Sequence, residues 1–220
     1  MVKTEKNMAE DIAIVGAGGF GREISFLLDL INNNPGKFNK VGFYDDGVPA
    51  GTKVGDLGVI GNVDELNLVK SHLNVVIAIS NPIDLKSVNQ RLTNKFLNYP
   101  NIIHPDLKVF AGQNIIGIGN IFTEGFILTC NITIGNFNIF NTRVTIGHDV
   151  KIGNFNVFNP NTQISGEVTI LDANFFGVNS CVLQGLSIGS CNMLGACSLL
   201  TRRIRDGKKY FGIPAKLMRE

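Results

Sequence analysis

The sequence predicts a mixed fold, in which a small α/β domain with Rossmann-like topology is followed by a parallel β-helix. Three observations support this prediction. Large apolar residues recur every six positions in the second half of the chain, similar residues recur every eighteen positions, and a glycine-rich turn separates an apolar run from an amphipathic segment near the start. We expect the two domains to span residues 1–105 and 106–220.

The six-residue repeat continues without interruption through sixteen positions. A period of six fits no helix, whose apolar face repeats about every 3.6 residues, and glycine and β-branched residues are frequent in this region. A glycine or another small or polar residue usually follows each apolar one, which indicates a corner that needs a positive φ. The repeated residues are Phe110, Ile116, Phe122, Leu128, Ile134, Phe140, Ile146, Ile152, Phe158, Ile164, Ile170, Phe176, Val182, Ile188, Leu194 and Leu200.

A second repeat of eighteen residues sets the length of one coil. Positions eighteen apart hold the same kind of side chain, and parallel in-register β-structure favours such stacking of like on like. Three six-residue units therefore close one triangular coil, although this arithmetic leaves the handedness open. The clearest columns are phenylalanine at Phe122, Phe140, Phe158 and Phe176, and asparagine at Asn120, Asn138, Asn156, Asn174 and Asn192.

The predicted β-helix carries few charges. Phe137 and Phe155, eighteen residues apart, lie outside the columns that fill its interior. A flat face with stacked aromatic side chains and few charges is typical of a surface buried against another subunit, so we expect a homotrimer rather than a monomer. The charged residues between Phe110 and Leu200 are Glu124, Arg143, Asp149, Lys151, Glu167 and Asp172.

A strand, a glycine-rich turn and a helix are predicted in succession near the start of the chain. The apolar run 11–15 leads into the motif G-x-G-x-x-G at Gly16–Gly21, and the next ten residues have their apolar side chains on one helical face. Backbone N–H groups at such a helix N-terminus suit a phosphate. A second strand at 41–44 ends in Asp45 and Asp46, where an acid that contacts a ribose or a base would lie.

The rest of the first domain completes only about half of a dinucleotide-binding fold. A third strand is predicted at 75–80, a helix at about 82–97, and a short strand leading to Ile103. A full NAD site needs a second βαβ half, and none is visible in the sequence. We therefore expect a nucleotide-linked ligand rather than NAD. The alternative is that the glycines only close the turn.

Composition and charge exclude several classes of protein. Apolar residues make up 44% and charged residues 17%, which is typical of a folded globular protein. The net charge of +2 gives no reason to expect nucleic acid or a membrane surface as a partner, and no apolar run approaches the roughly 20 residues that span a bilayer. The four cysteines have no C-x-x-C spacing, so we expect free thiols and a cytoplasmic location.

His148 is the candidate catalytic residue among three histidines. His72 and His104 are expected to be a surface residue and a structural residue, whereas His148 follows a coil corner in the motif IGHD. The residues eighteen positions away, Cys130 and Gly166, are small, so a substrate could approach the ring. A neutral imidazole is the natural base for an amine or a hydroxyl that attacks a thioester, and we expect catalysis rather than a surface role.

Asp149 is a weaker candidate as the partner of this imidazole. It could hold the ring in one tautomer and stabilise the imidazolium. However, adjacent residues in a strand point to opposite faces, so contact between them requires distorted corner geometry, or an acid from elsewhere.

The C-terminal segment is basic. It is either a solvated tail or a set of contacts to the phosphates of coenzyme A, and the residue types alone favour neither interpretation. Its basic residues are Arg202, Arg203, Arg205, Lys208, Lys209, Lys216 and Arg219.

Several motifs occur here in one order, namely Gly16–Gly21, Asp45-Asp46, the six-residue repeats, TIGHD at 145–149 and GIPAK at 212–216. In this combination the chain resembles the hexapeptide-repeat sugar acyltransferase family of the bacillosamine-pathway N-acetyltransferase and the sialic acid O-acetyltransferase. The resemblance covers almost the whole chain. It implies a homotrimer of left-handed β-helices, acetyl-CoA as co-substrate between neighbouring prisms, and a nucleotide-linked sugar bound at the N-terminal domain.

The resemblance also implies a role for residues that match the family's motifs. One pair would act as general base and as the acid that raises its basicity, a second set would contact the nucleotide-linked sugar, and a third would line the acetyl-CoA slot. These sets are His148 and Asp149, then Gly18, Gly19, Phe20, Asp45 and Asp46, and finally Val178 and Ala196.

Three residues depart from the pattern of the family. Phe20 stands where a histidine is common, Asp149 is shorter than the glutamate of the bacillosamine enzyme, and Val157 replaces a histidine that contacts the cofactor. These differences leave the sugar and the acceptor atom open.

We expect direct acetyl transfer to the amino group of a nucleotide-linked amino sugar. The alternatives are O-acetylation of a sialic acid or another glycan hydroxyl, and a noncatalytic trimeric scaffold. A metal-dependent β-helix enzyme would need a cluster of histidines in the repeat, where the sequence has one, so no metal is expected.

Overall fold

The computed structural model of the chain describes residues 9–33, 37–107 and 113–218, so Phe110 and Arg219 lie outside the described residues. The chain divides into two compact units. One contains residues 1–78 and 91–99, and the other contains residues 79–90 and 100–220. None of the described helices is long and apolar enough to span a bilayer.

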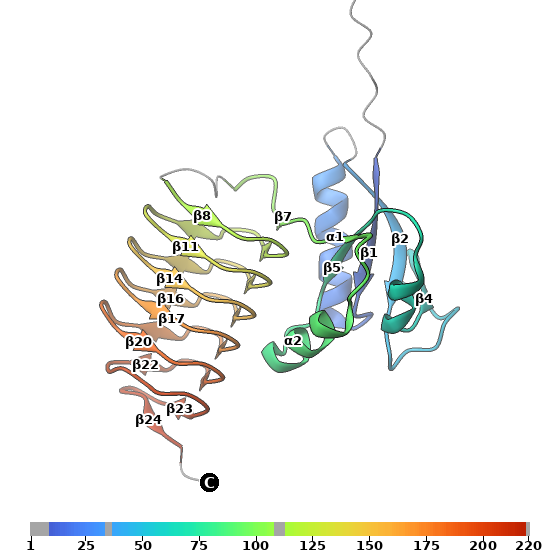
Figure 1. Cartoon of the computed structure of the whole chain (residues 1–220). Helices are drawn as coiled ribbons and strands as arrows, with labels where there is room; N and C mark the ends of the chain where they lie inside the picture. Colours follow the sequence, from blue (N-terminus) through green and yellow to red (C-terminus); the bar gives the residue numbers. More distant parts are fainter. Residues whose placement is uncertain (1–8, 34–36, 108–112, 219–220) are drawn as a thin grey trace, which may run out of the picture. The chain divides into compact units, whose positions relative to one another are not determined.

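The first unit contains a six-stranded sheet in the order β3-β4-β2-β1-β5-β6 (Figure 1). All neighbouring strands are parallel except the pair β3–β4. This order, in which the chain runs outward from β1 in one direction and then in the other, is that of a Rossmann-like half. The strands are β1 (Glu10–Val15), β2 (Phe38–Tyr44), β3 (Lys53–Val54), β4 (Leu57–Gly61), β5 (Leu73–Ile77) and β6 (Leu97–Asn98).

Helix α1 (Gly19–Asn32) follows β1, and its apolar face is buried at Ile24, Leu27 and Leu28, as the spacing predicted. Helix α2 (Pro82–Arg91) ends six residues before the predicted limit. The reason lies in Asn67, whose side chain accepts hydrogen bonds from the N–H groups of Thr93 (2.9 Å) and Asn94 (3.2 Å). Those N–H groups would otherwise continue the helix.

The segment between β2 and β5 was not predicted to be ordered into regular elements. It forms the hairpin β3–β4 and a short 3₁₀ helix, η1 (Val63–Leu68). Asn62 and Glu65 close the start of η1 as a capping box, in which each side chain accepts from the backbone N–H of the other residue. These elements extend the parallel sheet by one strand, β4, which pairs with β2.

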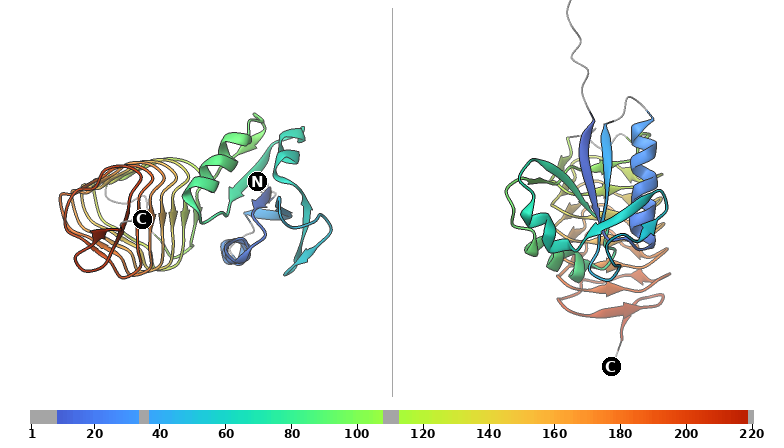
Figure 2. Two further views of the ribbon diagram at one scale, coloured as in Figure 1. Left: turned by 90° about the horizontal axis from the view of Figure 1, so that it is seen from below. Right: turned by 90° about the vertical axis from the view of Figure 1, so that its right-hand side faces the viewer.

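The second unit is a parallel β-helix built from three sheets (Figure 1). Strands two residues long pair with strands eighteen residues further on, so one coil consumes eighteen residues, as predicted. The view along the axis shows the coils superimposed (Figure 2, left). One sheet contains β8 (Ile115–Ile116), β11 (Thr133–Ile134), β14 (Lys151–Ile152), β17 (Thr169–Ile170) and β20 (Ser187–Ile188), and the next contains β10 (Ile127–Leu128), β13 (Thr145–Ile146), β16 (Gln163–Ile164), β19 (Cys181–Val182) and β22 (Leu199–Leu200).

The third sheet begins and ends the β-helix. It continues past the last full coil into a short antiparallel pair, β23–β24. Its members are β7 (Ile102–Ile103), β9 (Ile121–Phe122), β12 (Ile139–Phe140), β15 (Val157–Phe158), β18 (Phe175–Phe176), β21 (Met193–Leu194), β23 (Lys209–Phe211) and β24 (Lys216–Leu217).

The predicted columns of like side chains fill the interior. The rings of Phe122, Phe140, Phe158 and Phe176 stack in parallel with centroids 5.0, 4.9 and 4.6 Å apart. The asparagine column forms a continuous buried ladder, in which each side-chain N–H donates to the side-chain oxygen eighteen residues before it, at 3.0 to 3.1 Å. Outside the main column, Phe137 and Phe155 also stack, with centroids 5.5 Å apart.

The glycines after the apolar positions have a different role from the one predicted. Gly147 does not have a positive φ, and a Cβ there would lie 2.6 Å from the backbone nitrogen of Gly166. The left-handed conformation comes two residues later, where Asp149 has φ 60°. The prediction of a positive φ at these glycines is therefore wrong. They are needed because neighbouring coils approach too closely to admit a side chain.

Candidate active site

His148 lies on a corner of the β-helix, just after β13. Its ring Nδ1 is 2.7 Å from Oδ2 of Asp149, and the two side chains are 49% and 50% exposed. Hydrogen bonds to the coils on either side hold this corner in place. The N–H of Asp149 donates to the carbonyl of Cys130 (3.1 Å), and the N–H of Glu167 donates to the carbonyl of His148 (2.8 Å). The imidazole is therefore held at the corner but remains open to a substrate.

The contact between these adjacent side chains depends on the backbone of Asp149. In an extended strand, neighbouring side chains would point to opposite faces. Asp149 instead has φ 60°, in the left-handed region, and this turn brings its carboxylate to the imidazole. The structure thus has the distorted corner geometry that the pairing required, and among the described residues no other carboxylate pairs with His148.

The pairing decides which nitrogen of the ring carries the proton. Hydrogen bonds from the His148 ring and from the side chain of Asn131 hold the pKa of Asp149 below its ordinary value, so its carboxylate is ionised at neutral pH. An ionised carboxylate only accepts, which places the proton of the neutral ring on Nδ1. Nε2 then keeps its lone pair and can act as a base.

Asn131 is a residue of this site that the sequence analysis missed. It lies eighteen residues before Asp149 and has the same left-handed backbone, with φ 57°. Its side chain therefore lies one coil away from the Asp149 carboxylate and helps to hold the pKa of that carboxyl below its ordinary value. The eighteen-residue period, applied to Asp149 as it was to His148, would have identified it.

Gly166 makes room for the ring of His148. A Cβ at Gly166 would lie 2.6 Å from both Nε2 and Cε1 of that ring, so the imidazole occupies the space that a side chain would fill. In the described part of the chain, the N–H of Gly166 has no hydrogen-bond acceptor. A free N–H beside a basic nitrogen is suited to stabilising an oxyanion.

The glycine-rich turn Gly16–Gly21 joins β1 to α1, as predicted. Gly18 precedes the first helical residue and has no side chain to cap it, and the first turn contains no acid. A Cβ at Gly18 would meet nothing within 4 Å. This helix end is therefore an open, positively polarised array of N–H groups, which suits a phosphate. Gly19 is exposed and Phe20 is half-buried in the same turn.

Gly18 and Gly21 are expected to respond differently to alanine. A Cβ at Gly21 would overlap the carbonyl oxygen of Gly16, which is backbone and cannot move aside, so Gly21→Ala should lower the free energy of unfolding by about 3 kcal/mol. Gly18→Ala meets open space and should leave stability within about 0.5 kcal/mol of the wild type. Chemical denaturation of the two variants checks this, and equal stability would contradict the packing described here.

Asp45 and Asp46 follow β2 and form hydrogen bonds within the chain. Asp45 accepts from the N–H of Ala17 (2.7 Å) in the glycine-rich turn, and from those of Gly47 (2.8 Å) and Val48 (3.0 Å). Asp45 therefore fixes the shape of the turn. Two hydrogen bonds hold the pKa of Asp46 below its ordinary value. The bond from Arg91 (2.7 Å) has the larger effect, and the bond from the Val63 N–H has the smaller one.

Arg91 was not identified from the sequence as a partner of Asp46. It also pairs with Asp64, at 2.9 Å. Nothing in the local sequence around Arg91 indicates this contact, because it joins residues 45 positions apart. Of the two predicted acids, Asp46 is the one paired with a charged side chain, Arg91, which is 36% exposed.

Val178 and Ala196 lie on a different corner of the β-helix from His148. They are eighteen residues apart, in adjacent coils, and both are exposed. In the described residues, their N–H groups donate to no acceptor. Two apolar side chains with two free N–H groups form a surface that suits a chain of methylenes and amides. Val157, where the resembling enzyme has a histidine, is buried in β15.

The remaining predicted residues are not part of this site. His104 is buried, and its Nδ1 accepts from the N–H of Asp106 at 3.4 Å, so it is structural as expected. His72 is exposed and packs edge-on against Phe96. The basic residues of the C-terminal segment from Arg202 to Lys216 are exposed. In the part of the chain that is described, no group of histidine, cysteine and acidic residues could hold a metal ion.

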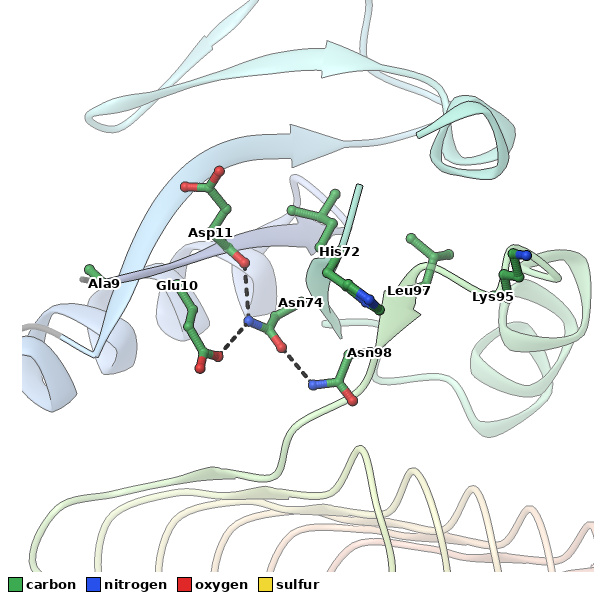
Figure 3. A pocket seen from close by; sticks show the side chains of 9 residues that line it. Ala9, Glu10, Asp11, His72, Asn74, Lys95, Leu97 and Asn98 are labelled. Atoms are coloured by element: carbon green, nitrogen blue, oxygen red, sulfur yellow. Dashed lines mark hydrogen bonds between the residues drawn. The ribbon is translucent and has the colours of Figure 1, made fainter. Parts of the chain in front are cut away.

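A hollow of about 830 Å³ lies at the amino ends of β1, β5 and β6 (Figure 3). The glycine-rich turn is at the carboxyl end of β1, so the hollow is separate from it. Three of its polar side chains are hydrogen-bonded to one another. Asn74 donates to Glu10 (3.0 Å) and accepts from Asn98 (2.7 Å). These residues therefore hold neighbouring strands of the sheet together.

Comparisons with known proteins support the fold described above. Residues 11–92 match the family model of the PglD N-terminal domain. The acetyltransferase domain of PglB from Neisseria gonorrhoeae FA1090 is 26% identical, with a TM-score of 0.86 over 95% of this chain and 100% of that one, and it has also been solved with acetyl coenzyme A. No curated protein matches the sequence.

Two further solved structures have the same fold. WeeI from Acinetobacter baumannii AYE is 25% identical, with a TM-score of 0.84 over 96% of this chain and 100% of that one. PerB from Caulobacter crescentus, solved with CoA and GDP-perosamine, is 22% identical, with a TM-score of 0.86 over 96% of this chain and 98% of that one. The chain, with its α/β unit and left-handed β-helix, is therefore an acyltransferase that resembles the sugar acetyltransferases of the bacillosamine pathway, and its residues 11–92 match their PglD N-terminal domain.

Proposed function

We propose that the protein transfers an acetyl group from acetyl-CoA to the amino group of a nucleotide-linked amino sugar. The observation that carries the proposal is the pair His148–Asp149, 2.7 Å apart on an exposed corner, with the Cε1–Nε2 edge of the ring against Gly166. This arrangement supplies a base with a defined tautomer beside a free backbone N–H.

The proposed mechanism is direct transfer. Nε2 of His148 removes a proton from the sugar amine as its nitrogen attacks the thioester carbonyl, and a C–N bond forms. The N–H of Gly166 donates to the oxyanion of the tetrahedral intermediate. The C–S bond then breaks, and the imidazolium returns the proton to the sulfur of CoA. Asp149 stabilises the imidazolium during these steps.

The glycine-rich turn is proposed to hold the nucleotide-linked sugar. The free N–H groups after Gly18, together with Gly19 and Phe20, would bind the diphosphate, with Asp46 and the turn shaped by Asp45 contacting the base. The Caulobacter crescentus protein, solved with GDP-perosamine, supports this class of ligand.

Acetyl-CoA is proposed to lie along Val178 and Ala196, whose free N–H groups suit the amides of its pantetheine arm. Within one β-helix these residues and His148 lie on different corners, because Val178 follows His148 by one coil and two thirds of the next. A donor that touches both must therefore lie between two prisms. This supports a homotrimer, and the four free thiols, Cys130, Cys181, Cys191 and Cys197, support a cytoplasmic location.

Gly166→Ala is expected to lower kcat by about 10²-fold in a chain that still folds. The new methyl group would meet the far end of the His148 side chain, which can swing aside but then leaves its catalytic position. Gly147→Ala is the matched control, because its Cβ would meet backbone atoms of the next coil and should lower stability instead. Kinetics and thermal denaturation of both variants test this, and an unchanged kcat for Gly166→Ala would contradict it.

Thermal-shift screening of the full-length protein against UDP-, GDP-, dTDP- and CMP-linked amino sugars and NAD tests the nucleotide-binding part of the proposal. A ligand that binds only the folded state raises the melting temperature. We expect one class of nucleotide sugar to do so, NAD to have no effect, and Gly18→Ala to abolish the shift without unfolding the chain. Stabilisation by NAD alone would overturn it.

A further inference from the structure

The corner that carries His148 continues into the next two coils with three residues that the mechanism does not fully use. Gly166 lies one coil beyond His148, and Gln184 lies one coil beyond Gly166. Glu167, next to Gly166, has φ 60°, the same left-handed conformation as Asp149. Its Oε1 accepts a hydrogen bond of 2.8 Å from Nε2 of Gln184.

This bond decides where the carboxylate of Glu167 lies. Gln184 is in the column of His148 and Gly166, so its amide draws the carboxylate toward that column. The imidazole lies over Gly166 from one side. Along this corner the His148 ring, which lies over Gly166, is therefore followed by the Glu167–Gln184 pair.

Glu167 carries a negative charge that no cation in the described residues balances. Gln184 is neutral, and neither lysine nor arginine forms an ion pair with Glu167 in the described part of the chain. The other acids of the described coils differ from it. Asp149 is bonded to His148, Asp172 accepts from the N–H of Asn154 (2.7 Å), and Glu124 lies on another corner.

We propose that Glu167, held by Gln184, is a specificity-determining residue that binds the protonated amine of the acceptor sugar beside His148. This inference rests on the proposed function and deepens it, because it selects an amine over a hydroxyl. At neutral pH a free sugar amine is largely an ammonium group, and the carboxylate would concentrate it beside the exposed His148 ring. A hydroxyl acceptor carries no charge and gains nothing there.

The interaction acts on binding rather than on the chemical step. The bound ammonium releases one proton to water to become the free amine. The amine then attacks the thioester, and its second proton goes to Nε2 of His148 and from there to the sulfur of CoA. Because the carboxylate favours the ammonium form, it lowers KM without raising kcat. Glu167→Gln is therefore expected to raise KM and not to lower kcat.

The test is a titration of the full-length protein with D-glucosamine in the presence of CoA at low ionic strength. The probe is the imidazole Cε1–Hε1 NMR signal of His148, which His148→Ala assigns among three histidines. We expect glucosamine to shift this signal saturably, and Glu167→Gln to weaken its binding about fivefold, the range of an exposed ion pair. N-acetyl-D-glucosamine, which has a neutral amide, should give no saturable shift.

Glu124→Gln is the matched control, since it removes the same charge from another corner and should leave glucosamine binding unchanged. Added salt should weaken binding to the wild type but not to Glu167→Gln. Equal binding by the wild type and Glu167→Gln, or no glucosamine shift in the wild type, would overturn the proposal. The titration requires no acetyl transfer, so a failure of the proposed function would be seen separately, in the kinetics.

Discussion

Replacing His148 by alanine is expected to lower kcat by about 10³-fold, the usual contribution of a positioned general base. The side chain is half exposed, and its bonds to the rest of the protein are limited to the pair with Asp149, so the melting temperature should stay the same. His72→Ala is the control, because His72 is an exposed imidazole that takes no part in this corner. If the activity of His148→Ala equals that of the wild type, His148 is not the base, as in an enzyme with another base or in a noncatalytic scaffold.

Asp149→Asn separates the role of the base from the role of its partner. Unlike the carboxylate, the amide introduced by Asp149→Asn can donate an N–H to Nδ1. Nδ1 then acts as the acceptor, and the proton of the neutral ring moves to Nε2. We expect a loss of about 10²-fold in kcat with little change in KM, because the ring stays in place but is in the wrong tautomer. An unchanged kcat would mean that the 2.7 Å contact has no catalytic role.

Asn138→Ala is expected to lower the free energy of unfolding by about 4 kcal/mol. Asn138 is fully buried in the middle of the asparagine ladder. Its side-chain oxygen accepts from the N–H and the side chain of Asn156 (2.9 and 3.0 Å), and its amide donates to the carbonyl of Gly153 (2.9 Å). The substitution leaves the N–H of Asn156 and the carbonyl of Gly153 without partners, each costing roughly 1–3 kcal/mol, and leaves the Asn156 side chain with only its bond to the carbonyl of Asn154 (3.3 Å).

The measurement is the urea concentration at half-unfolding, compared with that of Lys151→Ala, which removes an exposed side chain from the same coil. We expect a large decrease for Asn138→Ala and almost none for the control. A loss below about 1 kcal/mol in Asn138→Ala would mean that water or a neighbouring side chain replaces the ladder.

The sequence contains most of the information about the β-helix because its regularity is long-range and simple. An eighteen-residue period is repeated through five coils, so each column predicts the next, and both the phenylalanine stack and the asparagine ladder follow from it. The glycine-rich turn was equally predictable from the sequence, since strand, turn and helix are consecutive. The hairpin β3–β4 and η1 were not, because short segments without periodicity depend on tertiary contacts.

The geometry of the site could be predicted only in part from the sequence. The residue at the corner could be identified, but the φ of Asp149 could not, and that one angle decides whether its carboxylate meets His148. Likewise, the steric role of Gly147 depends on the distance between coils rather than on its own conformation. The bond from Arg91 to Asp46 joins distant segments that carry no shared pattern.

Product analysis after incubation of the full-length protein with acetyl-CoA and nucleotide-linked amino sugars tests the central claim most directly. The account predicts one acetyl group on the sugar nitrogen, as an amide that resists hydroxylamine, formed by the wild type and not by His148→Ala. An acetyl ester cleaved by hydroxylamine, or a product formed equally well by His148→Ala, would contradict it.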